Sequence, residues 1–123
     1  MTTSSNGSCH CQRVRFQVRA AIERLVECDC SVCTKKGIVH VPVGEKDFSL
    51  LAGEQDLAVY RFGSNTAEHW FCRHCGIHTH GRPRSDPSRY TVNARCLDLY
   101  EDIRARVPLT RFDGKNHPAD RPR

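Results

Sequence analysis

The sequence contains few of the residues that normally hold a small domain together. Of its 123 residues, only 38% are hydrophobic and 7% are aromatic, with one tryptophan and one methionine. A chain of this length forms one domain by size, and folding removes only about two thirds of its unfolded surface from water. Because burial alone is a modest source of stability here, we expect cross-links through disulfides or metal ions to add to it.

The sequence also lacks any long apolar run. No stretch approaches the roughly 20 apolar residues of a membrane-spanning helix. The first eight residues, MTTSSNGS, have neither the basic start nor the apolar centre of a secretory signal. We therefore predict a cytoplasmic protein that does not enter a membrane and whose thiols stay reduced.

Acidic residues are fewer than basic ones, which gives a net charge of +5 and a pI near 8.9. Part of the excess lies near the C-terminus, in Arg104, Arg106, Arg111, Lys115, Arg121 and Arg123. A nucleic-acid-binding surface is one use of such charge. Acidic residues are interspersed, however, and neither a basic helix nor a series of stacking aromatics is visible. A solvated basic tail is therefore favoured, and nucleic acid is not an expected partner.

Cysteine, by contrast, is abundant, with eight in the chain. Seven of them fall into three short motifs: Cys9 and Cys11; Cys28, Cys30 and Cys33; Cys72 and Cys75. Spacings of one or two residues between cysteines are typical of metal sites. Since the thiols are expected to stay reduced, zinc binding is favoured over a disulfide framework.

The segment 72–76 has the form of a zinc knuckle, in which Gly76 permits the positive φ that such turns often need. A knuckle supplies two ligands where a structural zinc needs four, and Cys9 and Cys11 are the natural candidates for the other two. A second site with only three thiolates then remains: Cys28, Cys30 and Cys33. Spacing alone does not exclude the opposite grouping, in which the knuckle pairs with Cys28 and Cys30.

The position of Cys96 bears on whether the second site is open. In a strand at 90–97, alternation places Cys96 on one face with Val92 and Ala94, which favours a buried core cysteine. The alternative is that its thiol lies near the open zinc position as a ligand, proton carrier or redox partner. If Cys96 or a histidine closes the second site, the protein is a binding module rather than an enzyme. No histidine is assigned as a base.

Short alternating or β-branched stretches separated by turns predict a mainly β domain without a long helix. The expected strands are 14–18, 25–27, 38–43, 48–52, 57–62, 67–71, 77–81 and 90–97, with a further short strand between Ile103 and Val107. A helical turn is expected at 34–37, closed by Gly37, and a loop at 82–87. We expect a flexible N-terminus at 1–6, a single zinc-binding domain at 7–112 and an irregular tail at 113–123.

Together the motifs at 8–11, 28–33, 71–76, 82–85 and 92–98 resemble the glutathione-dependent formaldehyde-activating enzyme family, which includes centromere protein V. The resemblance runs from about Gly7 to Asp98. It implies an Mss4-like fold of coiled antiparallel β-sheets stapled by zinc. It also implies a structural zinc ion bound by Cys9, Cys11, Cys72 and Cys75. A second zinc ion is implied at Cys28, Cys30 and Cys33.

The activity that the resemblance implies is of the carbon-sulfur lyase or synthase type, which joins glutathione to formaldehyde to give S-hydroxymethylglutathione. The chain is shorter than the formaldehyde-active type, and its segment 82–98 is more similar to the centromere protein V branch, which leaves the substrate open. The remaining alternative is a non-catalytic, zinc-stapled module that binds chromatin, nucleic acid or protein.

The expected chemistry follows from the ligand set. Three thiolates on Zn²⁺ leave a net charge of about −1, which weakens the activation of water but suits the binding of a substrate thiol. We hypothesise that a thiol such as glutathione takes the open position and reacts there with a small electrophile. The residues assigned to catalysis are Cys28, Cys30, Cys33 and Cys96. The residues assigned to bind a carboxylate of the thiol substrate are Arg82, Arg84 and Arg95.

Overall fold

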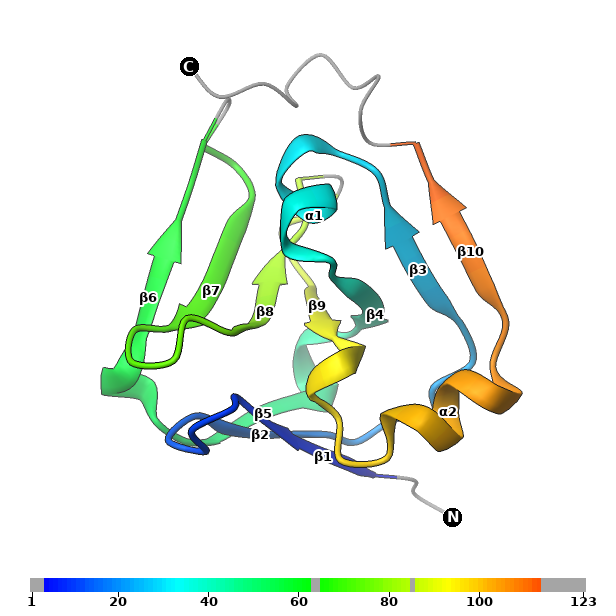
Figure 1. Ribbon diagram of the computed structural model, residues 1–123, viewed down its shortest axis with the longest axis horizontal. Coiled ribbons are helices and arrows are strands. Elements are labelled where there is room, and N and C mark those ends of the chain that lie inside the picture. Colours follow the sequence, from blue (N-terminus) through cyan, green and yellow to red (C-terminus); the bar gives the residue numbers. More distant parts are fainter. Residues whose placement is uncertain (1–3, 63–64, 85, 114–123) are drawn as a thin grey trace.

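The computed structural model describes residues 4–62, 65–84 and 86–113, in which short strands form two β-sheets (Figure 1). The strands are β1 (Ser5–Ser8), β2 (Arg15–Val18), β3 (Leu25–Cys28), β4 (Val39–Val43), β5 (Phe48–Ala52), β6 (Leu57–Tyr60), β7 (Glu68–Cys72), β8 (His78–Arg82), β9 (Tyr90–Asn93) and β10 (Leu109–Phe112). The helices are α1 (Ser31–Lys36) and α2 (Tyr100–Arg106), with 3₁₀ turns at Glu45–Asp47, Glu54–Asp56 and Ala94–Cys96. The mainly β class predicted from alternation is confirmed.

The two sheets differ in size and position. The smaller has the order β1-β2-β5, and the larger has the order β10-β3-β4-β9-β8-β7-β6. Figure 1 shows the small sheet along the bottom of the molecule and the large sheet rising above it, with β6 and β7 on the left, β3 and β10 on the right and α1 between them. The expected antiparallel pairing holds for the described strand pairs except β3 and β10, which are parallel.

Strand β4 separates the hydrophobic core from the functional side of the large sheet. Its residues alternate, so Val39, Val41 and Val43 are buried in the core while His40 and Pro42 lie on the opposite face. Other members of this core come from both sheets and from α2: Phe16, Val18, Leu25, Val92, Ile103 and Val107. One face of the sheet is thus apolar and packed, and the other is free to carry polar groups.

The strand predicted between Ile103 and Val107 is wrong, because this segment belongs to helix α2 and its C-cap. Ile103 and Val107 are four residues apart, which is the spacing of one helical face, and both are buried in the core. Acidic residues stand in the first turn of α2 and basic residues in the last, an arrangement that complements the helix dipole.

Strand β9 is shorter than the strand predicted at 90–97. It ends at Asn93, whose side chain accepts a hydrogen bond from the backbone N–H of Arg95 at 3.2 Å. This local bond favours the 3₁₀ turn at Ala94–Cys96 over a continued strand. Cys96 is therefore not on the strand face where alternation placed it.

Both ends of the described chain contain a strand that the sequence pattern did not indicate. In β1, Ser5 pairs with Val18 and Asn6 pairs with Gln17, so sheet pairing begins within the segment expected to be flexible. β10 completes the edge of the large sheet beside β3. Residues 1–3 and 114–123 of the predicted termini lie outside the described residues. Among the described helices, none is long and apolar enough to cross a membrane.

Two glycines adopt the conformations that the sequence required of them. Gly37 closes α1 with a φ of 69°, and its N–H donates to the Cys33 carbonyl oxygen. Gly76 has a φ of 79° at the end of the predicted knuckle. Both angles lie in the left-handed region that favours glycine. The helical turn predicted at 34–37 is the second half of α1.

Candidate metal centres and pocket

Four cysteines from distant parts of the chain meet where the small sheet approaches β7. The sulfur atoms of Cys9, Cys11, Cys72 and Cys75 lie within 4.8 Å of one another. The Cys9 and Cys11 sulfurs are 3.6 Å apart, and those of Cys11 and Cys72 are 3.7 Å apart. A tetrahedral zinc ion with Zn–S bonds of about 2.3 Å requires sulfur separations of about 3.8 Å, so this donor set fits zinc.

Backbone groups support the same reading of the four-cysteine cluster. The N–H of Val14 donates to the Cys9 sulfur, and the N–H of His74 donates to the Cys72 sulfur, both at 3.4 Å. Amide donors aimed at sulfur stabilise thiolates, as expected of metal ligands. Cys9 and Cys72 are only 2% and 0% exposed. Cys11 and Cys75 are partly buried. The cluster offers four protein ligands, which is typical of a structural zinc site.

The second cluster surrounds the start of α1. Cys28 ends β3, Cys30 caps α1 and Cys33 lies within the helix, and their sulfurs also lie within 4.8 Å of one another. The backbone N–H of Cys33 donates to the Cys30 sulfur at 3.4 Å. Among the described residues, no further cysteine, histidine or carboxylate joins this group. It is therefore a three-ligand set, which fits a zinc ion that keeps one coordination position for another molecule.

Both groupings match those implied by the family resemblance, and the opposite grouping of the knuckle with Cys28 and Cys30 does not occur. All eight cysteines are free thiols, so the disulfide framework is also absent. That the two clusters hold zinc stays a prediction, supported by the identity and spacing of their sulfur atoms.

The titration of the three-cysteine cluster indicates a need for positive charge. Hydrogen bonds from the Cys28 and Cys33 thiols lower the pKa of Cys30 to about 2. The same kind of contact, with Cys28 and Cys30, raises the pKa of Cys33 above its ordinary value. Cys33 thus keeps its proton in hydrogen bonds to its neighbours, and burial and the charge of Cys30 add to this effect. A cation bound by the three sulfurs would compensate their charge and favour the thiolate forms.

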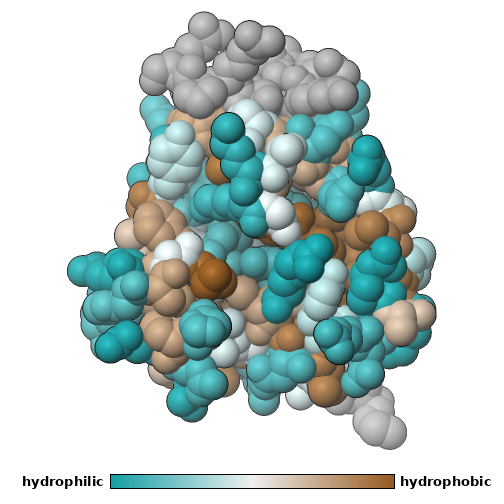
Figure 2. All heavy atoms as spheres, in the orientation of Figure 1, coloured by the Kyte–Doolittle hydropathy of each residue, from teal (hydrophilic) through white to brown (hydrophobic). Residues whose placement is uncertain are grey.

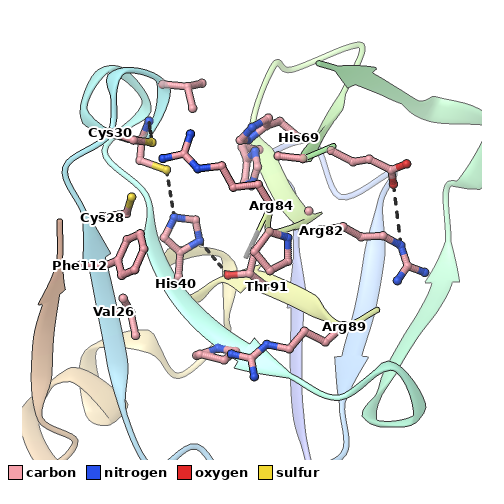
Figure 3. A pocket seen from close by; sticks show the side chains of 18 of the residues that line it. Val26, Cys28, Cys30, His40, His69, Arg82, Arg84, Arg89, Thr91 and Phe112 are labelled. Carbon is pink, nitrogen blue, oxygen red and sulfur yellow. Dashed lines mark hydrogen bonds and ion pairs between the residues drawn. The ribbon is translucent and has the colours of Figure 1, made fainter. Parts of the chain in front are cut away.

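His40 lies beside this cluster on the pocket face of β4. Its Nε2 is 3.2 Å from the Cys33 sulfur, and its Nδ1 is 2.8 Å from the Thr91 hydroxyl oxygen (Figure 3). Burial lowers the pKa of His40 to about 4, which keeps the ring neutral at pH 7. Since Thr91 holds one nitrogen, the other remains directed at Cys33. His40 positions Cys33 without belonging to the three-sulfur group.

A pocket of about 450 Å³ opens beside the cluster. Its wall is the face of the large sheet opposite the hydrophobic core, where polar and apolar side chains are mixed: Val26 and Cys28 of β3, His40 and Pro42 of β4, Thr91 of β9, and Thr110 and Phe112 of β10. These residues are two apart within each strand, as one face of a sheet requires. The sheet curls, so its side chains surround a hollow that reaches Cys28, Cys30 and Cys33.

The pocket carries positive charge. Arg24, Arg84 and Arg89 are among its lining residues. Figure 3 shows Arg84 extending toward the cysteine cluster, whereas Arg89 lies at the other end of the hollow. The acidic side chain among the described lining residues is Glu68, which forms a 2.7 Å ion pair with Arg61 outside the pocket. Such a pocket attracts anionic ligands.

Of the three arginines assigned to ligand binding from sequence, Arg84 lines the pocket with its side chain extending toward the cysteine cluster. Arg82 lines the pocket, but its guanidinium donates to Glu45 and to the Tyr90 hydroxyl, both at 2.9 Å, and it also lies over the Tyr90 ring. Arg95 does not line the pocket; its Nε donates to the Gly37 carbonyl oxygen at 3.1 Å. Arg24 and Arg89 were not singled out, because isolated arginines in loops carry no sequence signal.

Cys96, assigned to catalysis from sequence, lies away from the three-cysteine cluster. Its thiol donates to the His78 carbonyl oxygen at 3.4 Å, and it packs against the main hydrophobic core. Burial raises its pKa to about 12, and the neighbouring Cys9 and Cys75 add to the increase. It does not line the pocket. The structure therefore favours the core-cysteine interpretation over a role at the open zinc position.

Two histidines that sequence reasoning left unassigned also line the pocket. His69 and His78 lie on neighbouring strands with ring centroids 6.0 Å apart, and the Nε2 atom of each is buried without a hydrogen-bond partner. Burial lowers the pKa of His69 to about 4 and that of His78 well below its ordinary value. Because β7 and β8 carry several histidines, periodicity alone did not show which of them face the hollow.

Acid should destabilise the fold through its buried histidines, and His80 offers a test. Burial, followed by the charge of Arg82, lowers the His80 pKa from 6.5 to about 4. The unfolded chain therefore binds protons that the folded chain does not, so stability is full above about pH 6.5 and is lost as the pH falls toward 4. We expect wild type to lose about 2 kcal/mol more than His80→Phe between pH 7 and pH 5.

Denaturant unfolding at the two pH values measures this difference. Phenylalanine keeps an aromatic ring against Phe48 and Trp70, which pack on His80 with centroid distances of 4.7 and 6.2 Å. Metal loss at low pH affects both proteins and cancels in the comparison. Equal losses would mean that His80 titrates alike in the folded and unfolded chains.

Comparisons with known proteins agree with this geometry. The family model described as glutathione-dependent formaldehyde-activating enzyme matches residues 4–110, which include both cysteine clusters and the pocket-lining strands up to Thr110. Among solved structures, the crystal structure of a Rhodobacter sphaeroides protein is similar, with 38% sequence identity and a TM-score of 0.75. The match covers 85% of this chain and 99% of that one.

Proposed function

This chain belongs to the glutathione-dependent formaldehyde-activating enzyme family, and on that premise we propose that it is a carbon-sulfur lyase or synthase that joins glutathione to an aldehyde. One observation carries the proposal: a three-cysteine cluster opens into a pocket lined by arginines. The cluster suits a thiol, and the arginines suit carboxylates. Glutathione carries a thiol between two carboxylate ends, so it matches both features.

A zinc ion held by the three thiolates would lower the pKa of a substrate thiol and favour its reactive thiolate form. The chain itself holds the donor set in place. The α1 backbone donates to Cys30, and His40, held by Thr91, contacts Cys33. Because these contacts exist before substrate arrives, the geometry of the cluster is preorganised.

The arginines orient the thiol within the pocket. Arg84, near the cysteine end, and Arg89, at the other end, are separated along the hollow (Figure 3). In the proposed complex each pairs with one carboxylate of glutathione, so the cysteinyl sulfur between them is directed at the cluster. Val26 and Phe112 add apolar walls that limit the access of water.

The reaction balances without any further reagent. The S–H bond of the thiol and the π bond of the aldehyde carbonyl break, while one C–S bond and one O–H bond form. The thiol proton therefore ends on the former carbonyl oxygen, and neither an oxidant nor a reductant is needed. The reverse reaction is the corresponding lyase step.

The decisive experiment is to incubate the purified protein with glutathione and formaldehyde and follow adduct formation by NMR exchange spectroscopy, which measures rates even when the uncatalysed equilibrium is fast. We expect a rate above that of the uncatalysed mixture, and chelator-treated protein should lose the enhancement. Absence of any enhancement, together with absence of glutathione binding by calorimetry, would contradict the proposal. Those results would favour a non-catalytic scaffold.

Removing the Arg84 charge should weaken glutathione binding selectively. A charge-assisted hydrogen-bonded pair contributes about 1.5–3 kcal/mol, so Arg84→Met should raise the KM for glutathione about 10- to 100-fold. Arg95→Met is the matched control, since Arg95 lies outside the pocket and should leave KM unchanged. Equal KM values for both variants would show that Arg84 does not bind the thiol substrate.

A further inference from the structure

A second hollow of about 490 Å³ adjoins the pocket and has a different character. Its walls include the aromatic side chains of Tyr60, Phe62 and Phe71 and the lysines Lys35 and Lys36 of α1. We call this hollow the aromatic groove. Val32 and Phe62 line both the groove and the pocket, so the two hollows adjoin at these residues. Since Val32 lies between Cys30 and Cys33 in sequence, the groove begins beside the cysteine cluster.

Stacked rings connect the groove to the pocket. The Tyr60 and Phe62 centroids are 5.6 Å apart with an interplanar angle of 24°, and those of Phe62 and His69 are 5.5 Å apart with an angle of 22°. Tyr60 is at the outer end and is 41% exposed. Figure 2 shows apolar surface on both sides of centre, and the part on the left lies on the side where Figure 1 places β6 and β7. A continuous aromatic surface of this kind suits a planar ligand.

The rim of the groove is cationic. Lys36 Nζ lies 5.3 Å from the centroid of the Phe71 ring and 3.3 Å from the Nδ1 of His78. Lys35 is exposed one residue earlier in the same helix turn. None of the described residues that line the groove is acidic. A negative group on the ligand would therefore be attracted to the helix side of the groove.

Neither substrate in the reaction with formaldehyde makes use of these features. Glutathione has no aromatic group, and its two carboxylates are matched by arginines in the pocket. Formaldehyde has a single carbon and nothing that could contact a groove. An aromatic, cationic surface that begins beside the reacting position is therefore suited to a larger second substrate.

We propose that the aromatic groove binds the ring of an aryl aldehyde that carries a carboxylate, with its carbonyl carbon directed into the pocket. The ring would stack on Tyr60 and Phe62 while the carboxylate pairs with Lys35 or Lys36. The bond changes are those of the proposed reaction: the thiol S–H and the carbonyl π bond break, and C–S and O–H bonds form. This inference rests on the proposed function and names the class of its electrophile.

The test compares 4-formylbenzoate, benzaldehyde and formaldehyde as partners of glutathione. We expect kcat/KM for 4-formylbenzoate to exceed that for formaldehyde by about tenfold or more. Tyr60→Ala should lower kcat/KM for 4-formylbenzoate about tenfold and leave formaldehyde within about twofold. Lys35→Gln and Lys36→Gln together should affect 4-formylbenzoate more than benzaldehyde, which lacks the charge.

The variants are chosen to keep the fold. Tyr60 is exposed at the end of the edge strand β6, and Leu51→Ala, a change at a 58% exposed residue outside the groove, is the matched control. Binding of 4-methylbenzoate, which cannot react, is followed separately by NMR shifts of the aromatic signals of Tyr60 and Phe71. Saturable shifts in the wild type support the inference if the Phe71 signals, which both proteins contain, show weaker binding in Tyr60→Ala.

The outcomes separate this inference from the proposed function. One result overturns the inference while the proposed function stands: formaldehyde reacts with glutathione, 4-formylbenzoate has no higher kcat/KM, and 4-methylbenzoate does not shift the groove signals. If none of the aldehydes reacts with glutathione, the proposed function fails and the electrophile assignment falls with it.

Discussion

Cys75→Ser is expected to prevent stable folding. Cys75 belongs to the four-cysteine cluster, which joins the segment after β1 to the turn after β7. The binding free energy of a structural zinc ion is about 10–16 kcal/mol, which is as large as the whole stability of a typical domain. Losing one sulfur ligand removes much of that contribution, and the small hydrophobic content of this chain offers little to replace it.

Circular dichroism and thermal unfolding measure the effect, with zinc content determined in parallel. Cys96→Ser is the matched control. Cys96 is partly buried, as Cys75 is, but it lies outside both clusters. Its serine hydroxyl can still donate to the His78 carbonyl oxygen, so fold and metal content should stay close to wild type. A folded Cys75→Ser protein with unchanged unfolding temperature would show that the four-cysteine cluster is not structural.

Cys30→Ser should have the contrasting result: loss of half the bound zinc and of all catalysis, with the fold retained. Cys30 lies at the centre of the three-cysteine cluster and also caps α1. Serine is among the best N-cap residues, so the helix should still begin at Ser31. The hydroxyl is a far weaker zinc ligand than a thiolate, and two remaining cysteines hold the ion poorly.

Elemental analysis, circular dichroism and the glutathione assay together test this prediction. The fold should survive because Cys30 belongs neither to the two hydrophobic core clusters nor to the four-cysteine cluster. Wild-type zinc content in Cys30→Ser would contradict the assignment of the three thiols to one ion. Lost zinc with retained catalysis would instead place the chemistry elsewhere in the protein.

The features predicted correctly from the sequence are those that depend on neighbouring residues alone. Strand β5 was predicted at its observed bounds, and Gly37 and Gly76 adopt the positive φ expected of them. The pattern failed at the C-terminal third. Two apolar residues four positions apart, such as Ile103 and Val107, fit both the two-residue period of a strand and the 3.6-residue period of a helix. The acidic first turn and basic last turn of α2 are the signal that indicates a helix here. The long predicted strand at 90–97 failed because the side chain of Asn93 ends it.

The candidate site also contains residues that the sequence could predict and residues that it could not. Spacings of one or two residues marked the seven cysteines as metal ligands. The family resemblance indicated which motifs belong to the same cluster. The arginines and histidines of the pocket carry no such signal. Arg84 and Arg95 look alike in sequence, yet only Arg84 lines the hollow.

The amino-acid sequence by itself determined the mainly β class and the family, and through the family resemblance it indicated the division of seven cysteines into four and three. The mainly β class follows from alternation along single strands, and the resemblance follows from short motifs of neighbouring residues. The tertiary structure alone decided that Cys96 and Arg95 lie away from the pocket, that His40 contacts Cys33, and that an aromatic groove adjoins the pocket at Val32 and Phe62. Those facts depend on how the large sheet curls, which brings together side chains far apart in the chain, and the spacing of neighbouring residues does not record such long-range contacts.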